Sequence, residues 1–247
     1  MNLVNSFPEK SVKELRMIER KFYHHLCDSI IELVAQFSFT KEELCRRFTF
    51  RNLDLIESYF DQGRDILLAA AHYANWEWVI ASAYLSRYTH LGIYKKINNK
   101  WIDRMVINIR EKTGGIAVQM EDVPRRMKYY KDQNIPTLTY FVIDQRPLGK
   151  YIQYWTKFMN QDAPVYLGIE KIARKTGSVV LFLKVNQLKR GYYEAEFIPI
   201  TENPSATAVY EITEKHIRIL ESIIRERPEL WIWSHRRWKH KKPQIPN

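Results

Sequence analysis

The chain has 247 residues, 45% of them hydrophobic, and carries a formal net charge of +11. This length is ample for a sizeable core, and two cysteines without C-x-x-C spacing (Cys27 and Cys45) exclude a disulfide scaffold and a cysteine-based zinc site. The charge predicts an anionic partner, which on composition alone can be lipid headgroups, nucleic acid or an acidic protein.

No linker, internal repeat or low-complexity tract divides the sequence, so we predict a single domain over 1–247, with an N-terminal helical part (1–60) and an α/β core (61–247). No apolar stretch approaches the roughly 20 residues that span a bilayer. The segment 1–10 lacks the apolar core of a signal peptide. We therefore expect a cytoplasmic chain without a transmembrane helix.

Two capping signatures open predicted helices near the N-terminus. Ser11 followed by Glu14 starts a helix whose apolar stripe includes Ile18, Phe22 and Ile30, and Thr40 starts a second helix in the same way. A third helix is expected within 48–60. Such stripes usually face a core, and the alternative for helices this rich in Lys and Arg is a position on a membrane surface.

The segment 66–77 carries the strongest chemical signal. An apolar run from Ile66 to Ala71 predicts a buried strand that stops at His72, and Glu77 follows at the start of a helix-compatible segment. Residues five apart on one helix are about 140° from each other, so His72 and Glu77 pair only if His72 lies in the turn after the strand. In that geometry His72 is a candidate general base, and Glu77 would accept a hydrogen bond from its other ring nitrogen. The alternative is a histidine satisfied in a turn and a carboxylate that favours a helix start.

The stretch His72-Tyr73-Ala74-Asn75-Trp76-Glu77 resembles the signature of the bacterial lipid A late acyltransferases, an H-x4-D/E acyltransferase family. The resemblance implies a glycerolipid acyltransferase-like fold and acyl transfer from an acyl thioester to a lipid hydroxyl, with His72 and Glu77 as the catalytic dyad. Family members usually start with a hydrophobic anchor helix, whereas this sequence resembles the region after it. Membrane contact is then peripheral, or the chain is a truncated form.

Two further segments supply candidate substrate-binding residues. A basic residue of the family corresponds to Arg110, which implies a place on the acyl-donor or phosphate-binding surface, since a guanidinium donates two parallel hydrogen bonds. The alternative is a solvated arginine near a helix C-terminus. The buried run 137–143 predicts a strand that ends at Asp144 and Gln145, where the family has D-H-D-x-G-P. This departure leaves the reaction class intact and puts the acceptor in doubt.

The C-terminal third predicts a β-hairpin, a long helix and a basic aromatic tail. The hairpin joins 178–183 to 192–197 through Lys189-Arg190-Gly191. Ahead of the hairpin, Asn160 stands where the family commonly has glycine. The tail 231–242 resembles the family's W-x-H-R-R ending. Its tryptophans suit an anionic lipid surface, and the alternative is burial against the sheet with Arg237 as a structural ion-pair partner.

We expect an α/β fold with a central mixed sheet, helices on both sides and an N-terminal helical segment. The favoured function is acyl transfer to a lipid A precursor at the cytoplasmic face of the inner membrane, from acyl carrier protein or acyl-CoA. Asn75 marks the helix opening where backbone N–H groups can stabilise the oxyanion. No metal or other cofactor and no nucleic acid is expected. The alternatives are a lysophospholipid or aminolipid acceptor, an inactive lipid-binding relative, and a nucleic-acid-binding module.

Overall fold

The computed structural model describes residues 2–96 and 98–243, except for the side chains of Ile102, Val106 and Ile109. Its α-helices are α1 (Asn2–Ser6), α2 (Val12–Ala35), α3 (Lys41–Arg47), α4 (Leu53–Asp61), α5 (Lys100–Glu111), α6 (Val123–Asp132), α7 (Gly168–Thr176) and α8 (Glu211–Glu226). The strands are β1 (Phe48–Phe50), β2 (Ile66–Ala70), β3 (Thr89–Tyr94), β4 (Ile116–Gln119), β5 (Thr137–Val142), β6 (Tyr154–Phe158), β7 (Gln161–Val165), β8 (Val179–Lys189) and β9 (Tyr192–Thr201). Short 3-10 helices occur at Gln36–Ser38 (η1), Trp78–Tyr84 (η2), Met120–Asp122 (η3), Gly149–Tyr151 (η4), Pro204–Ala206 (η5) and Pro228–Leu230 (η6).

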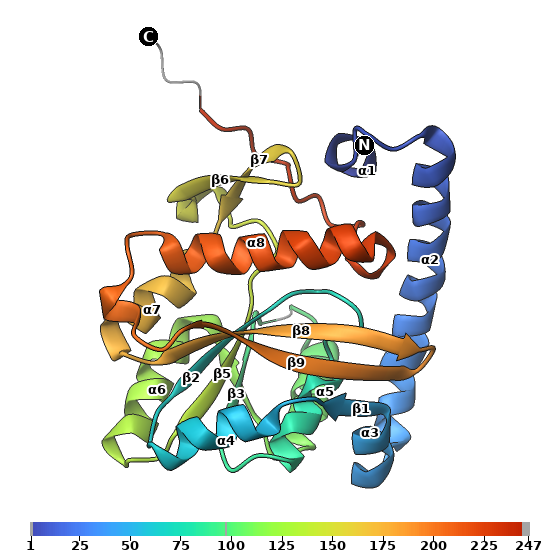
Figure 1. Cartoon of the computed structure of the whole chain (residues 1–247). Coiled ribbons are helices and arrows are strands. Elements are labelled where there is room, and N and C mark those ends of the chain that lie inside the picture. The colour runs from blue at the N-terminus through green and yellow to red at the C-terminus, as the bar shows by residue number, and fades with distance from the viewer. Residues whose placement is uncertain (1, 97, 244–247) are drawn as a thin grey trace.

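The predicted α/β fold is confirmed, with one seven-stranded mixed sheet at its centre (Figure 1). The strand order is β1-β9-β8-β2-β5-β3-β4, and β2, β3, β4, β5 and β8 run parallel. β9 is antiparallel to β8, as the predicted hairpin requires, and β1 is parallel to β9. The N-terminal helical part thus contributes the edge strand of the sheet. Helix α8 lies on one side of the sheet, and α4 and α5 lie on the other (Figure 1).

Strand β2 is the most deeply buried part of the sheet. Ile66, Leu67, Leu68 and Ala69 are fully buried, because β2 is hydrogen-bonded to β5 on one edge and β8 on the other and is covered on both faces. Such a strand is apolar along its whole length and does not alternate. This explains why the sequence reads as one apolar run up to His72.

The helix starts agree with the predicted caps. Ser11 and Glu14 form a capping box at the start of α2, and the hydroxyl of Thr40 accepts a hydrogen bond from the amide of Glu43 in α3. The helix expected within 48–60 is present as α4, but it occupies only the later part of that range. Residues Phe48–Phe50 pair with β9, since aromatic residues at alternate positions suit a strand, and helix α4 begins only at Leu53.

Asn160 forms the tight turn between β6 and β7. Met159 and Asn160 both have positive φ angles, 51° and 64°, and this left-handed conformation favours glycine, with asparagine the next best tolerated. The side-chain amide of Asn160 also donates to the backbone oxygen of Ser6 at 3.1 Å. The turn geometry therefore gives a structural reason for a residue that replaces glycine without breaking the hairpin.

Candidate active site

His72 and Asp144 meet because they occupy equivalent positions after two neighbouring parallel strands. Ala70 of β2 is paired with Val142 of β5, and each of the two side chains stands two residues beyond its strand. The register continues past the strand ends, because the amide of Ile143 donates to the backbone oxygen of Ala70 at 3.1 Å. The carboxyl ends of parallel strands form the edge where open α/β sheets bind their ligands.

The imidazole of His72 is held by Asp144 in one tautomer. Nδ1 of His72 donates to Oδ1 of Asp144 over 2.7 Å, which leaves Nε2 as an acceptor. The side-chain amide nitrogen of Gln145 lies 3.3 Å from this Nε2. Burial disfavours the imidazolium, but the charge of Asp144 and this hydrogen bond outweigh burial and raise the pKa of His72 above its ordinary value. The side chain of His72 is 22% exposed, so the imidazole is not sealed off from solvent.

Asp144 is fully buried and uses both carboxylate oxygens. Oδ2 accepts a 2.9 Å hydrogen bond from the indole Nε1 of Trp231 in the C-terminal segment. Burial alone would raise the pKa of Asp144, but the charge of His72 and the hydrogen bonds from His72 and Trp231 hold it below its ordinary value. Asp144 is therefore an ionised, fixed acceptor. No signal in the sequence connects Trp231 with this role.

The C-terminal segment also holds the backbone of the loop after β2. Tyr73 and Trp231 form an antiparallel bridge, the amide of Ala74 donates to Leu230 O at 2.9 Å, and the amide of Ile232 donates to His72 O at 3.2 Å. Ala74 has a positive φ of 52°, so the chain turns sharply directly after the His72-Tyr73 pair. The histidine is thus fixed through its backbone as well as its ring.

Asn75 is buried beneath the loop and its side chain points into the protein. Its amide nitrogen donates to Oε2 of Glu32 in α2 at 2.7 Å, and its side-chain oxygen accepts from the amide of Trp78 at 3.1 Å. Glu32 in turn accepts a hydrogen bond from the hydroxyl of Tyr193 at 2.9 Å. The side chain of Asn75 therefore anchors the loop after β2 to α2, and both its nitrogen and its oxygen already have hydrogen-bond partners within the protein.

Glu77 lies on the other side of the loop and binds Arg110, not His72. Oε1 of Glu77 accepts from the indole Nε1 of Trp76 at 3.0 Å and lies 3.7 Å from Nη2 of Arg110. The prediction of a hydrogen bond between His72 and Glu77 is therefore wrong, and Asp144 is the carboxylate that binds the imidazole. Asp144 occupies the Nδ1 side of the ring because the adjacent strand places it there, while Glu77 still acts on His72 through its charge.

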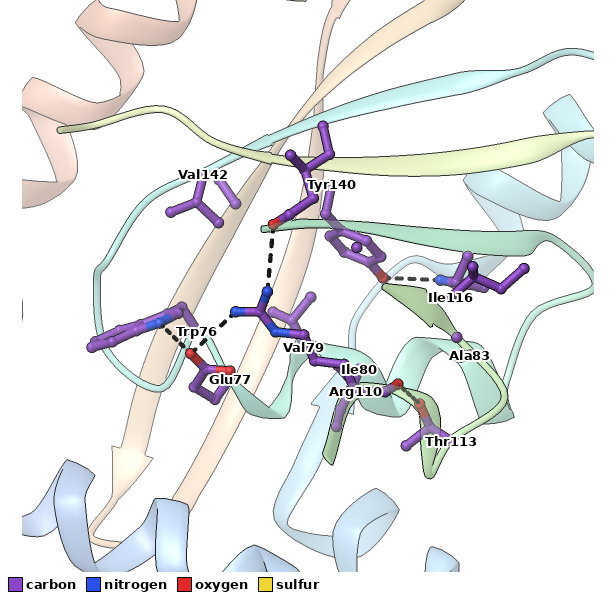
Figure 2. A pocket seen from close by; sticks show the side chains of 15 residues that line it. Trp76, Glu77, Val79, Ile80, Ala83, Arg110, Thr113, Ile116, Tyr140 and Val142 are labelled. Atoms are coloured by element: carbon purple, nitrogen blue, oxygen red, sulfur yellow. Dashed lines mark hydrogen bonds and ion pairs between the residues drawn. The ribbon is translucent and has the colours of Figure 1, made fainter. Parts of the chain in front are cut away.

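Arg110 reaches from α5 to the mouth of an apolar pocket (Figure 2). Its Nη1 donates to the backbone oxygen of Ile93 at 3.4 Å, and Glu77 stands between Trp76 and Arg110 in Figure 2. The pocket has a volume of about 60 Å³, enough for several water-sized groups. Its apolar walls are made by Ala70, Val79, Ile80, Ala83, Ile93, Ile116 and Val142.

Of the sequence-predicted site residues, Glu77 and Arg110 line the pocket, and His72 lies next to it. Ala70 lines the pocket two residues before His72, and the ring of Trp76 packs edge-on against the imidazole with centroids 5.2 Å apart. The structure thus brings together His72, Asp144 and Gln145 on one side, and Glu77 and Arg110 on the other. The side chain of Asn75 instead binds Glu32 of α2.

The tail tryptophans are part of the core. Trp231 and Trp233 are buried and pack against each other with ring centroids 4.7 Å apart, so the alternative of burial against the fold is the one observed. Arg237 is buried too, with its guanidinium 5.6 Å from the ring centroid of Phe158. Among the described residues it has no ion-pair partner, so its expected structural ion pair is not seen.

Two further observations concern metals and membranes. Within 2–96 and 98–243, no three His, Cys, Asp or Glu side chains gather in a way that would hold a metal ion. Over the same ranges, none of the helices combines the length and apolar character needed to cross a bilayer.

The family comparison agrees with this geometry. Residues 1–240 match the family described as bacterial lipid A biosynthesis acyltransferase. The chain belongs to this family. The search of curated proteins gave no match. Membership in the family implies acyltransferase chemistry, and the match extends from the N-terminal helices to the C-terminal segment that contacts Asp144.

Proposed function

We propose that this protein transfers a fatty acyl chain from an acyl thioester to a hydroxyl of a lipid A precursor, with His72 as the general base. The observation that carries the proposal is the 2.7 Å hydrogen bond from His72 Nδ1 to the buried Asp144. It leaves Nε2 as the proton acceptor next to an apolar pocket, and family membership supplies the reaction class. Asp144 takes the orienting part that the sequence suggested for Glu77.

The reaction follows from this arrangement. Nε2 of His72 removes the proton of the acceptor hydroxyl as its oxygen attacks the thioester carbonyl carbon. The C–S bond of the tetrahedral intermediate then breaks, and the leaving thiolate takes the proton from the imidazolium. Asp144 stabilises the imidazolium between the two steps, and the amide of Gln145 yields its place at Nε2 to the incoming hydroxyl.

Arg110 is the side chain best placed to stabilise the oxyanion. Its guanidinium lies at the mouth of the apolar pocket, where an acyl chain in the pocket would present its carbonyl. Glu77 holds the guanidinium from the outer side, so we assign Glu77 a positioning role. Backbone N–H groups at the start of η2, near Asn75, can act as additional donors.

We further propose that the donor is acyl carrier protein. An acidic carrier fits the net charge of +11 and the surface hollow formed by residues that include Lys96, Lys100 and Arg104 near the beginning of α5. Acyl-CoA is the alternative donor and would be recognised through its phosphates by the same cations. We propose the cytoplasmic face of the inner membrane as the place of reaction, with peripheral contact to the bilayer.

The proposal is tested by an acyl-transfer assay with labelled acyl carrier protein or acyl-CoA. The acceptors are a tetraacylated lipid A precursor, a lysophospholipid and an aminolipid. We expect transfer to the lipid A precursor and a loss of roughly 10²–10⁴-fold in His72→Ala, as is typical when a general base is removed. Transfer to another acceptor alone would reject the lipid A precursor as substrate. Normal turnover in His72→Ala would reject the mechanism.

A further inference from the structure

Helix α2 has an exposed apolar face near its C-terminal end. Tyr23, Ile30, Ile31 and Val34 are 56%, 57%, 61% and 64% exposed. At about 100° per residue, Tyr23, Ile30 and Val34 lie within an arc of roughly 40° on the helix surface. Single exposed apolar side chains are ordinary, but a contiguous group of large ones marks a contact surface. The prediction that the apolar stripe of this helix faces the core is therefore wrong for Ile30.

The same face becomes cationic toward the start of the helix. Lys13, Arg16 and Arg20 are exposed, and together with Val12 and Met17 they line a shallow hollow. Over the described part of the chain, none of these three cations takes part in an ion pair. We call the surface formed by Lys13, Arg16, Arg20, Tyr23, Ile30, Ile31 and Val34 the α2 face.

The apolar end of the α2 face is attached to the catalytic region. Glu32 of α2 accepts the hydrogen bond from Asn75, which lies in the loop after β2. In addition, the amino group of Lys112 donates to the backbone oxygens of Phe37 and Phe39 at 2.9 and 3.0 Å, directly after the helix that carries Arg110. The C-terminal end of α2 and the residues after it are thus hydrogen-bonded to the loop that follows β2 and to Lys112 directly after α5, the helix that carries Arg110.

We propose that the α2 face docks on an anionic lipid bilayer, with its aliphatic end in the interface and its cationic end on the headgroups. The charge of the cationic end is complementary to anionic lipids, and an interfacial helix combines such cations with an apolar face of this kind. The inference rests on the proposed function in that a membrane lipid is the acceptor. Docking on this face keeps the acceptor within the lipid layer as it approaches His72.

The test is co-sedimentation of the full chain with vesicles of phosphatidylcholine mixed with phosphatidylglycerol, and with vesicles of phosphatidylcholine alone. The first variant combines Ile30→Gln, Ile31→Gln and Val34→Gln, which keep helix propensity. The second combines Lys13→Gln, Arg16→Gln and Arg20→Gln. The control combines Leu188→Gln in β8 and Val209→Gln in the turn before α8, at positions that are 62% and 67% exposed. Circular dichroism and thermal unfolding check that each variant is folded.

We expect the aliphatic variant to bind the mixed vesicles at least tenfold more weakly than the wild type, and the control to bind normally. The cationic variant should lose the preference for phosphatidylglycerol. Unchanged binding of the aliphatic variant would overturn the proposal. A wild-type dimer that the aliphatic variant converts to a monomer would also overturn it, because the α2 face would then be an interface between two copies.

Activity separates this inference from the proposed function. Transfer to an acceptor dispersed in detergent should be unchanged in the aliphatic variant, while transfer to the same acceptor in vesicles should fall by at least tenfold. If the wild type binds vesicles through the α2 face but transfers no acyl group to any acceptor, the proposed function fails and the docking surface stands.

Discussion

Nδ1 of His72 and Oδ1 of Asp144 are 2.7 Å apart. His72 stands two positions after Ala70 of β2, Asp144 stands two positions after Val142 of β5, and Ala70 and Val142 are paired in the sheet. The strand register thus fixes His72 and Asp144 relative to each other. A site built on paired strands is more rigid than one built on two loops.

Asp144→Asn should lower kcat by roughly 10²–10⁴-fold with little loss of fold. The carboxylate accepts hydrogen bonds on both oxygens, from His72 and from Trp231, whereas an asparagine amide can accept on one side only. With the asparagine oxygen bound to Trp231, its NH2 group faces Nδ1, which favours the tautomer protonated at Nε2, and the imidazole also loses its counter-charge. Steady-state kinetics measure the effect, and thermal unfolding checks the fold. A rate within twofold of wild type would show that Asp144 does not orient the base.

The pH dependence of kcat/KM should show a rising limb with a midpoint above the ordinary histidine value of about 6.5. The base acts only when it is neutral, so activity increases as pH rises through the pKa of His72, which Asp144 and Glu77 raise against the effect of burial. In Asp144→Asn the loss of the negative charge should move this midpoint to lower pH. A midpoint that stays in place would mean that another group controls the limb.

Trp231→Phe should lower kcat roughly tenfold, because it removes the indole N–H that fixes Oδ2 of Asp144 and keeps most of the aromatic packing. Trp233→Phe is the matched control, since the Nε1 of Trp233 donates instead to the backbone oxygen of Pro228 at 2.6 Å. Both changes should reduce the free energy of unfolding by about 1–3 kcal/mol. Equal kinetic losses in the two variants would indicate a general packing effect.

Glu77→Gln and Arg110→Gln should each lower kcat, and the double variant should be about as slow as Arg110→Gln alone. This follows if Glu77 acts by holding the guanidinium, since residues that act as one unit are not additive. A double-mutant cycle on kcat provides the measurement. Additive effects would instead support the direct action of Glu77 on His72 that the sequence suggested.

Gly92→Val should shift the donor preference toward shorter acyl chains. Gly92 lines the apolar pocket, and a Cβ there meets only the backbone oxygen of Ile116, at the ordinary contact distance of 3.8 Å. The added methyl groups take up room that methylene groups of the donor would use, and each methylene changes selectivity by about 1–3 kcal/mol. A series of acyl donors measures kcat/KM, with the volume-conserving Ile116→Leu as control. An unchanged length profile would place the acyl chain elsewhere.

The sequence indicated most of the sheet and all five polar residues of the candidate site (His72, Glu77, Arg110, Asp144 and Gln145), but not how these residues pair. His72 and Asp144 were both recognisable as polar residues after apolar strands. Their contact depends on β5 inserting between β2 and β3, although β3 follows β2 in the chain. Strand order is a property of the whole packing, so local spacing favoured Glu77, which is near in sequence, over Asp144, which is near in space.

The remaining differences have similar causes. The periodicity of α2 indicated an apolar stripe that includes Ile30, but periodicity shows only that a face is apolar and not whether the fold covers it. The tail tryptophans illustrate the reverse case. A cluster of Trp, Lys and Arg suits a membrane interface by composition, whereas Trp231 and Trp233 are buried and Trp231 binds Asp144.

The contact of Trp231 with Asp144 also bears on when the site comes into existence during synthesis. His72 and Asp144 are 72 residues apart in the chain, and Asp144 and Trp231 are a further 87 apart. Contacts between such distant segments form late, after the intervening chain has been made and folded. A ribosome-bound chain that ends just after Asp144 already contains His72 and Asp144 but lacks Trp231, which holds the second carboxylate oxygen of Asp144. The complete arrangement of His72, Asp144 and Trp231 therefore forms only after a further 87 residues have been made, so a shorter nascent chain holds the pair without its full support.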